Sequence, residues 1–110
     1  MQALNTTGPR CPVRTALDLV GGKWKLLLLY QLADTPLRYS ELQKRLPEVS
    51  DKVLAQQLRI LEQDLLIERY DHRPAITPVV AYRLTPQGRA ALPLIEALVQ
   101  FAQAYAEKQR

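Results

Sequence analysis

Apolar residues recur at helical spacing along the first third of the chain. The stretch from Pro12 to about Val20 predicts a short helix, because proline suits the first helical turn and the pair Gly21-Gly22 then breaks the pattern. From Lys23 to about Ala33 the residues are apolar on nearly every side of a helix. We therefore expect this second helix to form the buried centre of the domain.

Two capped helices follow. After a turn, residues 37–39 favour a short extended piece, and Ser40 is a candidate N-cap for a helix that ends at Pro47. Ser50 is a second candidate N-cap, for a helix from Asp51 to about Asp64. Two helices separated by so short a turn predict a helix-turn-helix unit.

The spacing of apolar residues changes after Leu66. Residues 67–70 and 79–84 are rich in β-branched and aromatic side chains, which predicts two strands joined by a proline-containing tip. A single long helix is expected from about residue 86 to 108, with an apolar stripe at Leu92, Ile95, Leu98, Val99, Ala102 and Tyr105. The predicted fold class is mainly α with a small β-hairpin, a winged helix-turn-helix (α+β), in one domain over residues 1–110.

The helix from Asp51 has two chemically different faces. At 100° per residue its inward face carries Leu54, Leu58, Leu61 and Leu65, and its outward face carries Lys52, Gln56, Arg59 and Gln63. Glutamine pairs with adenine and arginine with guanine in the major groove, so the outward face suits a recognition helix. Any exposed helix face is polar, however, and it is the position between a short turn and a hairpin that favours DNA.

Other residues of these elements are candidate DNA contacts. The start of the first helix of the pair and the start of the second suit backbone phosphates, and prolines on both sides stiffen the tip of the hairpin. The candidate DNA-binding residues are Arg38, Tyr39, Ser40, Ser50, Asp51, Lys52, Gln56, Arg59, Arg73 and Thr77.

Composition excludes several other functions. Fifteen Lys and Arg against 11 Asp and Glu give a net charge of +4, a mild bias toward anionic partners. With one histidine, His72, and one cysteine, Cys11, we expect no metal, no cofactor and no enzyme activity. No apolar run is long enough for a membrane span or a secretory signal, so we expect a cytoplasmic protein.

Three segments resemble a known family. CPVRTALDLVGGKWKLLLLYQL, LRYSELQKRLPEVSDKVLAQQLRILEQDLLIER and YRLTPQGRAALPLI are similar to the HxlR-type winged-helix transcriptional regulators of bacteria. The resemblance implies a homodimer that binds a palindromic operator in double-stranded DNA. The resemblance implies that the first helix and the long last helix dimerise, so here the N-terminal segment of about 1–22 and the helix of about 86–108 would contribute to the dimer.

The chain departs from the family pattern in two places. Family members commonly have Asp-Gly-Leu after the recognition helix, whereas this chain has Asp64-Leu65-Leu66 and must turn without glycine. Ala81 stands where the family often has a glutamate in the wing, so wing contacts transfer least well.

The resemblance also gives Cys11 a possible role, because several family members sense oxidants or electrophiles through a cysteine at this Cys-Pro position. Arginines at 10 and 14 and a helix N-terminus favour a thiolate. A buried, inert thiol is the alternative. Two other functions stay open: a regulator that binds a small apolar ligand at the dimer interface near Trp24 and Tyr105, and a winged-helix module that binds protein instead of DNA.

Overall fold

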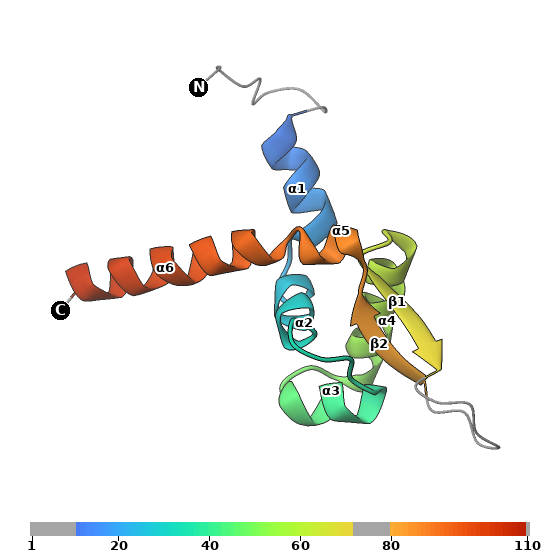
Figure 1. Cartoon of the computed structure of the whole chain (residues 1–110). Coiled ribbons are helices and arrows are strands. Elements are labelled where there is room, and N and C mark those ends of the chain that lie inside the picture. The colour runs from blue at the N-terminus through green and yellow to red at the C-terminus, as the bar shows by residue number, and fades with distance from the viewer. Residues whose placement is uncertain (1–10, 72–79, 110) are drawn as a thin grey trace.

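Figure 1 shows the protein as a computed structural model, which describes residues 11–71 and 80–109. Its elements confirm the predicted fold class, with helices on both sides of a two-stranded hairpin along the chain. In order they are α1 (Pro12–Val20), α2 (Lys25–Gln31), α3 (Tyr39–Arg45), α4 (Asp51–Gln63), β1 (Ile67–Asp71), β2 (Val80–Leu84), α5 (Pro86–Arg89) and α6 (Leu92–Lys108).

The core is built mainly from leucines. Leu28 and Leu29 of α2 are fully buried against leucines of α3 and α4. α2 thus lies at the core as expected, but its apolar residues are not all covered, because Leu27 and Tyr30 are 42% and 48% exposed. α2 is also shorter than predicted, and a seven-residue helix at this position covers the core with one face only.

The helix-turn-helix is present as predicted, although its first cap differs. The Ser50 hydroxyl accepts a hydrogen bond from the Val53 N–H at 3.2 Å, which confirms Ser50 as the N-cap of α4. Ser40 does not cap α3. The helix begins two residues earlier than a Ser40 cap requires, with Arg38 as its N-cap, because the Glu41 carboxylate accepts the Arg38 N–H at 2.8 Å.

The hairpin is antiparallel and is attached to the body of the domain. Its register runs from Ile67 opposite Leu84 to Asp71 opposite Val80. Leu37, just before α3, exchanges two backbone hydrogen bonds with Tyr82 of β2, at 3.0 and 2.8 Å. This bridge confirms the expected extended piece and ties the hairpin to the helix-turn-helix unit.

The prediction of one continuous final helix is wrong. α5 ends at Arg89, and α6 begins at Leu92 after a short turn. Pro93 explains the break, since it has no N–H to donate to the Arg89 carbonyl and its ring would clash with that carbonyl in a continuous helix. α6 then runs away from the other helices, as Figure 1 shows.

The turn after α4 contradicts one prediction made for the apolar face of this helix. Leu65 was expected on the inward face of the helix, but it is 64% exposed and has a φ of 61°, in the left-handed region. Its N–H donates to the Glu62 carbonyl, and the Leu66 N–H donates to the Leu61 carbonyl. These two bonds form a Schellman motif in which leucine occupies the position that glycine usually takes.

Candidate nucleic-acid interface

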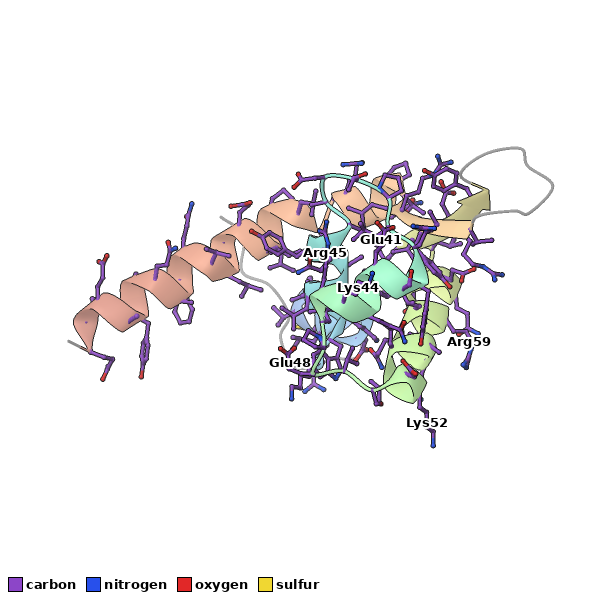
Figure 2. All side chains as sticks on the ribbon, turned by 90° about the horizontal axis from the view of Figure 1, so that it is seen from below. Glu41, Lys44, Arg45, Glu48, Lys52 and Arg59 are labelled. Carbon is purple, nitrogen blue, oxygen red and sulfur yellow. The ribbon has the colours of Figure 1, made fainter. Side chains whose placement is uncertain are left out.

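The outward face of α4 is the main polar surface of the helix-turn-helix. Its four predicted side chains are all exposed, while Leu54, Leu58 and Leu61 on the opposite face are buried. Figure 2 shows Lys52 and Arg59 projecting away from the helix. Neither forms an ion pair with another described residue, so both cationic groups are available to an external anion.

Tyr39 and Asp51 hold α3 and α4 together. The Tyr39 hydroxyl donates to the backbone carbonyl of Asp51 at 3.0 Å, and the Gln43 amide donates to the Asp51 carboxylate. Partial desolvation and the charge of Asp51 raise the pKa of Tyr39 above 10.0, so the phenol keeps its proton. In this arrangement the two residues fix the orientation at which α4 is presented.

The start of α3 carries charges of both signs. Arg38 lies 3.5 Å from the Glu41 carboxylate, and the Arg38 N–H bond is the main cause that lowers the Glu41 pKa below 4.5. Ser40 is exposed beside them. Figure 2 shows Lys44 and Arg45 on the same helix as Glu41. The cations of α3 thus lie on the same helix as a carboxylate that is already paired with Arg38.

A groove of about 500 Å³ separates α4 from the hairpin. Arg59 and Gln63 line it from α4, Tyr82 and Arg69 from the strands, and Tyr39 from α3. Desolvation is the main cause that raises the Tyr82 pKa above 10.0, so this phenol also stays protonated. The hydrogen-bonding face of α4 thus continues into a polar groove beside the hairpin.

Comparison with known proteins decides the family. The family model for the HxlR-like helix-turn-helix matches residues 19–110. The chain belongs to the HxlR-like helix-turn-helix family. It is 40% identical over 98 residues to the uncharacterized helix-turn-helix transcriptional regulator YdeP of Bacillus subtilis, which covers 89% of this chain and 76% of YdeP.

Solved structures share the fold of this HxlR-like chain. A protein from Porphyromonas gingivalis W83, described as a MarR-family transcriptional regulator, superposes with a TM-score of 0.82 at 34% identity, over 90% of this chain and 96% of its own. The redox regulator HypR in its oxidised form superposes with a TM-score of 0.78 at 34% identity, over 86% and 96%. The protein is therefore a winged-helix transcriptional regulator, a class for which the family implies DNA binding.

Two predicted contacts of the HxlR-like wing, Arg73 and Thr77, lie outside the described residues, as does His72, and they stay predictions. Arg69 and Glu62 also lie at the groove, although neither is among the predicted contacts. The alternation along β1 shows that Arg69 and Glu68 point to opposite faces, but the pattern gives no sign of which face turns toward α4.

Cys11 is the N-cap of α1 and only 1% exposed. Its backbone carbonyl accepts the Thr15 N–H at 2.9 Å, so it forms part of the first helical turn. Among residues 11–71 and 80–109 the structure holds no group of three or more potential metal-ligating side chains. No helix within those residues is long and apolar enough to cross a membrane.

The HxlR-like chain also exposes an apolar seam on α6 that only partly coincides with the predicted stripe. Leu92 and Ile95 turn toward the chain's own core, whereas the seam consists of Leu94, Leu98, Phe101 and Tyr105. Leu94 and Leu98 border an apolar groove of about 530 Å³ whose other side is formed by Val13 and Leu17 of α1. Leu26 lines this groove, and Trp24 and Tyr105 do not.

Proposed function

We propose that the protein binds promoter DNA sequence-specifically as a homodimer, with α4 in the major groove. The observation that carries the proposal is the outward face of α4, where Lys52, Gln56, Arg59 and Gln63 stand exposed on a helix anchored by three buried leucines. Arginine and glutamine are the side chains that pair bidentately with guanine and adenine. The amides at the Ser50 end of α4 suit a backbone phosphate.

The apolar seam supports the homodimer. Leu94, Leu98, Phe101 and Tyr105 follow the spacing of four, three and four residues that marks the contact face of paired helices. Phe101 and Tyr105 are 70% and 60% exposed in the single chain. The radius of gyration is 16.3 Å, where a compact chain of this length has about 13 Å.

A second copy of the chain is the occupant that these features favour. It would cover the seam of α6 together with the groove beside α1, because both are apolar and continuous through Leu94 and Leu98. Two-fold pairing would present two copies of α4 to the two halves of a palindromic operator. The regulator would then act in the cytoplasm, where the DNA is.

A second candidate property is a response to oxidants or electrophiles through Cys11. It is supported by the position of Cys11 at the N-terminus of α1, the helix that borders the apolar groove. Because the thiol is 1% exposed, the start of α1 must open before a reagent can reach it. A single cysteine forms a disulfide only with another molecule, so the product would link two subunits or carry a small thiol.

The DNA-binding proposal is tested by fluorescence anisotropy with the promoter region upstream of the protein's own gene and a random duplex of equal length. We expect tighter binding to the promoter and a steep loss of affinity with salt on both duplexes. Equal affinities for the two duplexes would reject sequence-specific regulation. Absence of binding to either would favour the protein-interaction alternative.

The redox proposal needs its own comparison. Wild type and Cys11→Ser are tested for promoter binding before and after treatment with a thiol oxidant, and non-reducing gels report any linked dimer. We expect the oxidant to change binding by wild type alone. A change of the same size in Cys11→Ser would reject Cys11 as the sensor and leave DNA binding untouched.

A further inference from the structure

The hairpin turns one face toward α4. Arg69 and Tyr82 are directly opposite each other in the strand register and share that face, while Glu68 and Arg83 share the other. The Arg69 Nε lies 3.2 Å from a carboxylate oxygen of Glu62, which belongs to α4. Across the groove, a side chain of the hairpin is thus paired with a side chain of the recognition helix.

This groove has the chemistry of an anion site that is partly occupied by the protein itself. Arg59 and Arg69 line its two walls, and the Tyr82 hydroxyl offers a further O–H donor. Glu62 is the acidic residue among the described residues that line it. Its carboxylate forms an ion pair with the guanidinium group of Arg69, whereas Arg59 has no ion pair with a described residue.

The location of the groove selects one anion. It lies directly beside Arg59 and Gln63, on the outward face of α4. When a recognition helix occupies the major groove and a hairpin lies beside it, a strand of the DNA backbone runs between the two elements. A phosphodiester of that strand is the anion that the position and the charge of Arg69 fit.

We infer that Arg69 binds a backbone phosphate of the DNA, and that Glu62 competes with this phosphate for Arg69. The inference rests on the proposed function, because it needs α4 in the major groove. In the free protein Arg69 pairs with Glu62, and on binding it exchanges the carboxylate for a phosphate oxygen. Since every duplex carries phosphates, Glu62 lowers the affinity for all DNA sequences and so limits non-specific binding.

The chain offers a matched control pair. Arg83 and Glu68 form an ion pair at 2.7 Å on the opposite face of the same hairpin, and both side chains are 47% exposed. Substitution of each residue of this pair changes the net charge of the protein by the same amount as the matching substitution of Arg69 or Glu62, without touching the groove. The variants are therefore Arg69→Gln and Glu62→Gln, with Arg83→Gln and Glu68→Gln as controls.

The affinity of each variant is measured over a series of salt concentrations, on the promoter and on a random duplex. We expect Arg69→Gln to bind both duplexes about tenfold more weakly, with the slope of log K against log salt reduced by about 1. We expect Glu62→Gln to bind both several-fold more tightly, and to lose that gain when combined with Arg69→Gln. The two control variants should change affinity by less than about twofold.

Three results would overturn the inference: Arg69→Gln matching Arg83→Gln, Glu62→Gln matching Glu68→Gln, or a Glu62→Gln gain that persists without Arg69. Melting temperatures of all variants exclude unfolding as the cause of weak binding. The readout for Arg69 is the random duplex, whereas that for sequence-specific regulation is promoter preference. A protein that binds both duplexes equally would reject the proposed function alone, and one that binds neither would reject both.

Discussion

The hydroxyl group of Thr85 donates a hydrogen bond to the backbone carbonyl of Leu65 at a distance of 2.5 Å. The same hydroxyl accepts the Gly88 N–H at 3.1 Å, and the Thr85 N–H donates to the Leu66 carbonyl. Thr85 is therefore both the N-cap of α5 and the residue that fastens α5 to the exit of α4. Through this link α4 is held in a fixed relation to α5.

Thr85→Val tests this link, because valine keeps the branched shape and removes the hydroxyl. We expect the free energy of unfolding to fall by about 1–2 kcal/mol, since the buried Gly88 N–H loses its acceptor and the Leu65 carbonyl its donor. Urea denaturation measures the change. Thr85→Ser keeps the hydroxyl and should retain most of the stability, so equal losses in both variants would contradict the assignment.

Leu65→Gly should stabilise the protein. Leucine at a φ of 61° carries the steric cost of the left-handed conformation, and the side chain is mostly exposed, so little packing is lost with it. We expect a gain of about 1 kcal/mol after the greater flexibility of glycine in the unfolded chain is included. Thermal denaturation checks this, with Leu65→Ala as the control that removes the side chain and keeps the strain. A gain of the same size in Leu65→Ala would argue against backbone strain.

Glu41 makes stability depend on acid pH. Its folded pKa lies below 4.5, first because its carboxylate accepts the Arg38 N–H and then because of the Arg38 charge. A carboxyl with a lowered folded pKa stabilises the protein above its unfolded pKa, and this contribution is lost as the pH falls through the folded value. The advantage of wild type over Glu41→Gln should thus shrink below about pH 4.5. An advantage that stays constant across an acid series of urea melts would refute it.

Phe101→Glu should convert the proposed dimer into a monomer. The substitution places a charge at the centre of the exposed seam of α6, where pairing would have to bury it. Sedimentation equilibrium measures the mass. Gln103→Glu adds the same charge on the opposite side of α6 and is expected to leave the dimer intact. If both variants have the mass of wild type, the seam does not mediate pairing.

Arg59 and Lys44 should differ in what they contribute to binding. Arg59→Ala is expected to cost about 1–3 kcal/mol on the promoter and to reduce preference over random DNA, because arginine on the outward face of α4 suits a guanine edge. Lys44→Ala, on α3, should weaken both duplexes by the same factor. Binding titrations on the two duplexes separate these patterns, and a uniform loss for Arg59→Ala would place Arg59 on the backbone instead.

Local signals in the sequence were sufficient for the helix-turn-helix. The serine that caps α4 and the four-residue spacing of Leu54 and Leu58 lie within one or two turns of the chain, so they can be interpreted without tertiary contacts. The hairpin followed from the same kind of local pattern. The outward face of α4, which forms the main part of the candidate site, was found in this way.

The features that could not be predicted from the sequence depend on contacts between elements, or on positions where two local signals favour different conformations. The apolar stripe predicts one helix from about residue 86 to 108, but Pro93 has no N–H to continue it and so divides α5 from α6. Leu65 fits the apolar face by angle, but the turn after α4 needs a left-handed residue and turns it outward. Arg69 lies in the candidate site because the hairpin packs beside α4, and this packing cannot be predicted from the strand pattern alone.

The backbone bridge between Leu37 and Tyr82 ties the helix-turn-helix and the hairpin into one unit of the molecule. The two hydrogen bonds of this bridge join the ends of a stretch of chain that includes α3, α4 and the paired parts of the two strands. α1 and α6 lie outside this stretch. If two copies pair through α6 as proposed, a change in that pairing would move α3, α4 and the paired residues of β1 and β2 together. The distance between the two α4 helices would change, while the position of each α4 relative to its own hairpin would not.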